Sequence, residues 1–205
     1  MSYWPQANVY GVLLNQRSEW AVLARHMNKP PHNSPPVAPV LYVKTANTWT
    51  ASGQAIVMPQ GVNELEVWAS VAMVMGEGGS VAGYVLMHDL TVPHDFFRPP
   101  VRAKCMDGML GLGPALTPVM DLPDLLGCEV EVRINGRSCH RTRCADMMKQ
   151  PVALLAAISK FMTLHPGDAL MLGSHVDRPL AKAGDRIEVL AEGMATLVNT
   201  LEAQP

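Results

Sequence analysis

Short β-prone runs, separated by turn-forming residues, constrain the fold of this chain more than any other feature of its sequence. Runs of this kind bounded by Gly, Pro, Asn and Asp are typical of strands. They cover residues 9–14, 40–44, 54–58, 64–75, 81–88, 129–134, 169–172 and 186–191. The most specific turn is Asn135-Gly136, because this pair favours the tight turn of a β-hairpin. The sequence therefore predicts a mostly β fold.

Helical periodicity is restricted to two segments. Residues 18–27 are predicted to form a short helix, and residues 151–164 repeat apolar side chains at helical spacing after a proline that a first turn tolerates. Residues 30–39 contain five prolines and cannot form a regular element. We therefore expect an α+β fold, mostly β with few helices, in a single domain of residues 1–205. Within it, residues 1–39 would supply a strand, a short helix and a Pro-rich loop packed on the remainder.

The composition excludes some classes of function. A net charge of -2 with no local run of Lys and Arg gives no basic surface for a phosphate backbone, so nucleic acid is not an expected partner. No stretch approaches the roughly 20 apolar residues that span a bilayer, and no basic start precedes an apolar block. No membrane association and a cytoplasmic location are therefore expected. Because 48% of the residues are hydrophobic and 17% are charged, subunit contacts are also expected.

The cysteines show neither a disulfide framework nor a zinc pattern. Cys105, Cys128, Cys139 and Cys144 include no CxxC pair and are too few for a disulfide scaffold, so we expect reduced thiols. Cys139, His140 and Cys144 have the wrong spacing for a zinc site. We interpret them as scattered thiols and a surface histidine.

Several phrases of the sequence, taken together, resemble one known family. They are VAMVMG at 71–76, VAGYVLMHD at 81–89, ING at 134–136, AD at 145–146, HPGDALMLGS at 165–174 and AGDRIEVLAEG at 183–193. From Val9 onward the chain thus resembles the fumarylacetoacetate hydrolase family. Two further phrases, NQRS at 15–18 and FFRPPVRAKCMDG at 96–108, are similar to one branch of it. That branch is the amino-terminal half of the bifunctional isomerase/decarboxylases of homoprotocatechuate (4-hydroxyphenylacetate) breakdown.

The resemblance implies a mixed β-roll, usually dimeric, that carries Mg²⁺ or Mn²⁺. The cation would polarise a 2-oxo acid while a C–C bond breaks or a double bond moves, because hard cations chelate such oxygens and stabilise the enolate. Relatives supply an E-x-E pair and an aspartate as ligands. Here the matching positions are Trp68, Ser70 and Asp89. Asp89 is thus the one expected carboxylate ligand, and we expect no firmly bound metal.

Two alternative metal sites are less favoured. Glu64 and Glu66 also form an E-x-E pair, but they lie about 13 Å upstream along a strand, so only a register shift would bring them in. A site rebuilt from His88, Asp89, His94 and Asp95 is the second alternative, since His and carboxylate suit Fe, Mn or Zn. Neighbours 88 and 89 point to opposite faces of a strand. A solvated turn is therefore the favoured interpretation.

The resemblance also implies roles for other residues. Asp89 and Lys104 would be catalytic, and the substrate-binding residues would be Lys44, Arg98, Arg102 and Ser174. Relatives carry a His and a Glu on a short amino-terminal helix that handle a water or a proton, where this chain has Glu19 and Val22. Residues 77–80 replace a longer segment near the active-site mouth, which predicts a more open site.

Three functions remain open from the sequence. The first is an enzyme subunit that isomerises or decarboxylates a 2-oxo-hex-3-ene-dioate type of acid from aromatic breakdown. The second is a non-catalytic partner that docks on a metal-bearing homologue. The third is a binder of a small 2-oxo acid without chemistry. A homodimer or a hetero-oligomer with the metal-bearing homologue is expected in either of the first two cases.

Overall fold

Two β-sheets form most of the protein in the computed structural model, which describes residues 3–30, 32–94, 101–122 and 124–204. The first sheet has the order β2-β1-β11-β5-β6-β7-β3, with β12 paired to β5 and β8 to β6. Its strands are β1 (Val9–Leu13), β2 (Val40–Lys44), β3 (Trp49–Ala51), β5 (Leu65–Met75), β6 (Val81–Thr91), β7 (Leu110–Leu112), β8 (Thr117–Pro118), β11 (Ala169–Met171) and β12 (Leu180–Ala181). It mixes parallel and antiparallel pairs, because β1 runs parallel to β11 and β3 runs parallel to β7.

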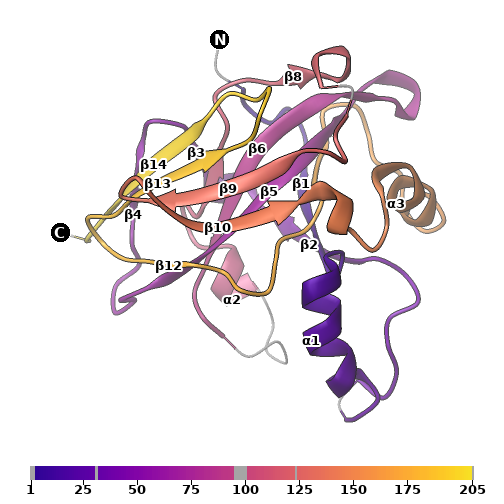
Figure 1. The fold of residues 1–205 in the computed structure, drawn as a ribbon, viewed down its shortest axis with the longest axis horizontal. Helices are drawn as coiled ribbons and strands as arrows, with labels where there is room; N and C mark the ends of the chain where they lie inside the picture. The colour runs from indigo at the N-terminus through magenta and orange to yellow at the C-terminus, as the bar shows by residue number, and fades with distance from the viewer. Residues whose placement is uncertain (1–2, 31, 95–100, 123, 205) are drawn as a thin grey trace.

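The second sheet has the order β10-β9-β13-β14-β4 and lies across β5 and β6 in Figure 1. Its strands are β4 (Ala55–Val57), β9 (Glu129–Ile134), β10 (Arg137–Arg143), β13 (Arg186–Leu190) and β14 (Leu197–Glu202). The β9–β10 turn has positive φ at Asn135 (53°) and Gly136 (78°). The hairpin predicted at this pair is therefore confirmed.

Helices are few and lie outside the sheets. They are α1 (Arg17–Met27), α2 (Val101–Lys104) and α3 (Pro151–Ile158), and α1 stands apart from both sheets in Figure 1. Short 3₁₀ turns cover Ala46–Thr48, Glu77–Gly79, Val119–Asp121 and Cys144–Asp146. No helix in the described ranges is long and apolar enough to cross a membrane. The expected mostly β fold with few helices is confirmed.

The predicted helix at 151–164 is six residues too long at its carboxyl end, since α3 stops at Ile158. Phe161, which the apolar stripe placed on the packed face, is 52% exposed. Met162 and Leu164 still pack against the core, but Pro166 disfavours helical backbone just before it.

The β5–β6 hairpin organises the core because its two faces bury different clusters. Alternate residues point to opposite sides of a strand. Val67, Val71 and Met73 face the second sheet, where they pack with residues such as Val132 and Ile187. The opposite face carries a smaller apolar cluster and, at the end of the hairpin distant from its turn, the polar side chains described next.

Candidate functional site

Asp89 lies at the centre of a buried cluster of charged side chains. The β5–β6 register places it directly opposite Trp68, on the face of the hairpin turned away from the second sheet. One carboxylate oxygen accepts a hydrogen bond from Lys44 Nζ at 2.8 Å, and the other accepts one from Lys104 Nζ at 2.7 Å. The side chains of Asp89, Lys44 and Lys104 are 0%, 0% and 2% exposed. Both oxygens of this carboxylate are thus neutralised within the protein.

Separate elements deliver the two lysines. Lys44 ends β2, and its Nζ also donates to the backbone carbonyl of Lys104. Lys104 ends α2, and its Nζ also donates to Thr91 Oγ1 at 2.9 Å. Both ammonium groups therefore have several oxygen partners, as buried charges require.

Tyr42 closes the cluster on the side of β2. Burial and the negative charge of Asp89 raise the pKa of the Tyr42 hydroxyl, and Lys104 Nζ lies 4.6 Å from the ring centroid. A Cβ at Gly11, the residue opposite Tyr42 in the β1–β2 ladder, would overlap the tyrosine ring. A glycine on β1 is therefore required for this packing.

Trp68 separates two cations. Lys104 Nζ and the guanidinium carbon of Arg178 each lie 3.3 Å from the centroid of its ring, and two groups this close to one centroid must occupy opposite faces. The indole N–H donates to Glu66 Oε2 at 2.8 Å. Because a cation is attracted to each face of a tryptophan ring, the indole binds both cations.

Arg178 connects this cluster to α1. It donates to Glu19 Oε1 at 2.6 Å, and the other oxygen of Glu19 accepts from the backbone N–H of Leu14 at 2.6 Å. The backbone bond from Val67 N to Pro179 O and the β12–β5 pairing fix the Arg178 segment beside Trp68. The cluster contains equal numbers of opposite charges, namely cationic Lys44, Lys104 and Arg178 with anionic Asp89, Glu19 and Glu66.

The ionisation of these groups follows from their burial and mutual charge. Burial alone would raise the pKa of Asp89, but Lys104 and Lys44 outweigh it and the pKa is lowered. Burial lowers the pKa of Lys104 to about 8 against the opposing effect of Asp89. Burial raises the pKa of Glu19 and lowers that of Arg178. The opposite charges of these two side chains act against both shifts. Asp89 and Lys104 are therefore both charged at neutral pH.

The other residues predicted for the site have different locations. Ser174 is buried, Arg102 is exposed, and Arg98 lies outside the described residues. Val22 is exposed on α1, whereas Glu19 at the neighbouring predicted position is buried against Arg178. Of the six predicted catalytic and binding residues, the structure brings Asp89, Lys44 and Lys104 into contact.

The described residues of the two alternative metal sites do not come together. Glu66 lies opposite Thr91 with no register shift near it, and it accepts the indole N–H of Trp68. His88 points to the opposite face from Asp89, where its Nε2 lies 2.9 Å from Asn199 Oδ1. His94 contacts the carbonyl of Val92, and Asp95 lies outside the described residues.

The residues around Asp89 do not fit a divalent cation. Trp68 offers no ligand atom, and the hydroxyl of Ser70 donates to the Val71 carbonyl. A cation against Asp89 would lie a few ångströms from two ammonium groups, whose repulsion is weakly screened in a buried site. Across the part of the chain that the structure describes, no group of three or more His, Cys, Asp or Glu side chains is placed to hold a metal.

The expectation of a more open site is wrong. The β5–β6 turn is indeed short, at Glu77–Gly79, but Asp89 is fully buried. Lys104, Trp68 and Arg178 lie beside it, so the short turn does not expose the Asp89 carboxylate. Arg178 had no sequence signal, because its partner Glu19 is 159 residues away.

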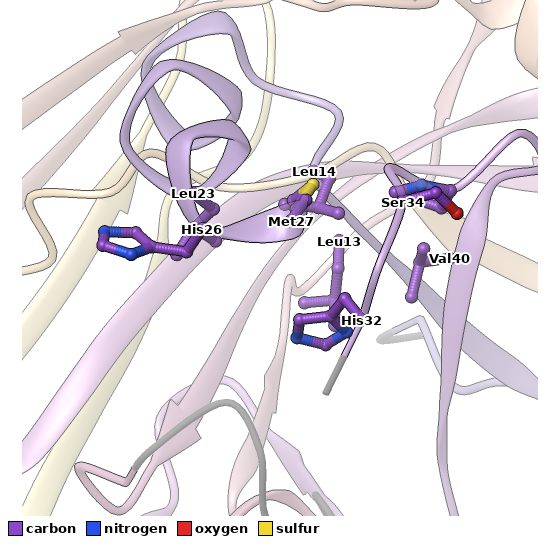
Figure 2. Close-up of a pocket in the computed structure, with 9 residues that line it drawn as sticks. Leu13, Leu14, Leu23, His26, Met27, His32, Ser34 and Val40 are labelled. Carbon is purple, nitrogen blue, oxygen red and sulfur yellow. The ribbon is translucent and has the colours of Figure 1, made fainter. Parts of the chain in front are cut away.

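A separate cavity of about 250 Å³ lies between α1 and the Pro-rich loop (Figure 2). Leu13, Leu14, Met27 and Val40 line it, with His32 at its edge. Of the residues predicted for catalysis or binding, those that the structure describes do not line this cavity. It is therefore not part of the Asp89 cluster.

Comparison with known proteins gives a consistent result. A family model described as fumarylacetoacetate (FAA) hydrolase C-terminal matches residues 8–202. The chain is 35% identical over 210 residues to the 4-hydroxyphenylacetate degradation bifunctional isomerase/decarboxylase of Salmonella dublin, covering 97% of this chain and 48% of that protein. The chain thus spans about half the length of the first curated relatives it matches.

Solved structures share the fold at lower identity. A 5-carboxymethyl-2-hydroxymuconate delta-isomerase from Mycobacterium smegmatis has a TM-score of 0.80 at 22% identity, covering 97% of this chain and 79% of that one. A fumarylpyruvate hydrolase from Pseudomonas aeruginosa, solved with Mn²⁺ and pyruvate, has a TM-score of 0.80 at 18% identity, covering 97% and 90%.

Proposed function

Because this chain belongs to the fumarylacetoacetate hydrolase family, we propose that it is a metal-independent, non-catalytic domain of a 2-oxo acid isomerase/decarboxylase of aromatic breakdown. Its role is to bind and stabilise a metal-bearing domain of the same family. One observation carries this proposal: both oxygens of Asp89, the one carboxylate remaining from the expected ligand set, are occupied by the ammonium groups of Lys44 and Lys104.

The contacts of Lys104 support a domain without the chemistry expected from the family. The family resemblance implies a catalytic role for Lys104, but here its ammonium group contacts Asp89, Thr91 and the Trp68 ring. An incoming carboxylate would have to displace all three partners. A substrate that did so would still lack a cation beside its developing enolate, a loss worth about two to three orders of magnitude in rate.

The proton-handling positions support the same conclusion. Glu19 accepts hydrogen bonds from Arg178 and from the backbone of Leu14, so its carboxylate has a structural role. Val22 is apolar. A positioned acid or base typically contributes roughly 10² to 10⁴ in rate, and neither residue is available to provide it.

A partner role agrees with the greater length of the curated relatives. The chain aligns with about half of the Salmonella dublin isomerase/decarboxylase, so the remaining half of that protein has no counterpart in this sequence. A folded but inert unit retains a function if it supports the fold of a catalytic one. Similarity to the 4-hydroxyphenylacetate degradation isomerase/decarboxylases favours a role in aromatic catabolism.

The test is an absorbance assay on a dienol 2-oxo acid with three samples. They are this chain alone, a metal-bearing homologous domain alone, and the two mixed, all with added Mn²⁺. We expect no turnover by the chain alone, and we expect the mixture to exceed the homologue in activity or thermal stability. Co-elution of the mixture in size-exclusion chromatography with light scattering measures the association directly.

Two outcomes would contradict the proposal. Turnover by the chain alone that is abolished by Asp89→Ala would identify it as an active isomerase or decarboxylase. Failure of every homologous metal-bearing domain to associate would remove the partner role. The exposed Asp121→Ala serves as a matched control, since it removes a carboxylate outside the buried cluster.

A further inference from the structure

Two of the four cysteines face each other where the β9–β10 hairpin meets the preceding turn. The ladder pairs Arg143 with Glu129, so the next positions in the same register are Cys144 and Cys128. The backbone N–H of Cys144 donates to the carbonyl of Cys128 at 2.9 Å. Directly opposed residues in antiparallel strands have Cα atoms about 4.5–5.5 Å apart, which lies within the range of about 4.4–6.8 Å that disulfides span.

Both side chains point to the same side of the hairpin. Cys128 and Cys144 belong to the core cluster between the sheets and are 6% and 5% exposed. The neighbouring Cys144 thiol lowers the pKa of Cys128. The same contact, with burial, raises the pKa of Cys144. The sulfurs are thus adjacent and chemically unequal.

Cys128, although 6% exposed, also borders open space. It lines an open groove together with the backbone at Gly127 and Gly193. The other two cysteines are placed differently, because the Cys105 thiol contacts the carbonyl of Val43 and the exposed Cys139 thiol contacts the carbonyl of Arg137.

We propose that Cys128 and Cys144 are a redox-active dithiol that closes to an intramolecular disulfide when the protein meets a peroxide. The Cys128 thiolate attacks one peroxide oxygen, which forms a sulfenic acid and releases the other oxygen as water after protonation. The Cys144 sulfur then attacks the Cys128 sulfur, the S–O bond breaks, and the hydroxyl leaves as a second water with the thiol proton. The two sulfurs lose two electrons in total, and the peroxide gains them.

The bridge would act on the junction with α1. The turn that begins at Cys144 continues to Met147 and Met148, which pair with Gln16 and Asn15 just before the helix. A covalent bond at Cys144 would restrict this junction. Oxidation is therefore expected to raise the urea midpoint of the whole chain, and dithiothreitol should reverse the change.

The test uses the full chain carrying Cys105→Ser and Cys139→Ser, which removes the other two thiols and keeps the buried pair. After hydrogen peroxide treatment, denaturation and alkylation, we expect both remaining thiols to be lost. Mass spectrometry should show one peptide pair joined between Cys128 and Cys144, about 2 Da lighter than its reduced sum because two thiol hydrogens leave. Reduction should restore both thiols.

Matched variants separate this result from other oxidations. In the same background, Cys144→Ser should instead accumulate sulfenic or sulfinic acid at Cys128, and Cys128→Ser should react more slowly. The proposal is overturned if the two-cysteine variant retains both thiols under conditions that oxidise Cys139 in the native chain. Bridging between chains, seen as a dimer without reductant, would overturn it equally.

Discussion

Replacing Asp89 with asparagine isolates the role of this carboxylate. The change keeps the size of the side chain but removes the carboxylate that contacts both Lys44 and Lys104. The amide oxygen can still accept from one ammonium group, whereas the amide N–H₂ would face the other as a second donor. Breaking a buried ion pair by removing one partner costs about 3–5 kcal/mol. We expect the free energy of unfolding to fall by about 4 kcal/mol.

The measurement is urea unfolding followed by circular dichroism at fixed protein concentration and neutral pH. Asp121→Asn is the matched control, because Asp121 is exposed and such changes usually stay within about 0.5 kcal/mol. The double variant Asp89→Asn/Lys104→Met should recover part of the loss, since it removes one of the stranded ammonium groups.

A vacant metal site would behave in the opposite way. There, a ligand carboxylate is unpaired when the cation is absent, and neutralising it relieves repulsion. Asp89→Asn that leaves stability unchanged or raises it would show that Lys44 and Lys104 do not depend on this carboxylate. The same conclusion would follow if the double variant loses as much stability as the two single variants together.

Three further results are expected. Burial lowers the pKa of His88 to about 4, so the stability it contributes is complete above its ordinary value of 6.5 and is lost as pH falls toward 4. The loss approaches about 3 kcal/mol over that window, and His88→Gln should flatten this part of the pH–stability curve. Gly11→Ala should lower the free energy of unfolding by about 1–3 kcal/mol, because the new methyl group overlaps the Tyr42 ring. Adding Tyr42→Leu should restore part of this stability. If the losses of the two single variants simply add in the double variant, that contact is excluded. Trp68→Ala should lower the free energy of unfolding by about 3 kcal/mol or more, since it creates a cavity and removes both cation–π contacts. A loss below about 1 kcal/mol would contradict the placement of the indole between Lys104 and Arg178.

Much of the fold follows from local sequence signals. The longest β-prone runs became β5 and β6, and Asn135-Gly136 formed the hairpin turn predicted for it. Strands β3 and β7 were not predicted, because three-residue strands carry too short a pattern and acquire their conformation from pairing with each other. Alternation along β5 correctly placed Trp68 and Ser70 on the face of the hairpin that carries Asp89.

The contacts within the Asp89 cluster were harder to predict from the sequence. Lys44 and Lys104 were recognised by resemblance, but nothing local shows that their ammonium groups turn onto Asp89 rather than toward a ligand. That outcome depends on Trp68, whose ring fills the space beside Lys104, and on Arg178 on its other face. Contacts between residues so distant in the chain appear only when the sheet and the β12 segment are assembled.

Calorimetric titration of the metal-free chain with Mn²⁺ tests most directly whether internal cations have replaced the metal. With both Asp89 oxygens bound to lysines, no saturable site tighter than about 1 mM is expected, and EDTA treatment should leave thermal stability unchanged. One tight Mn²⁺ site per chain that disappears in Asp89→Asn would contradict this claim.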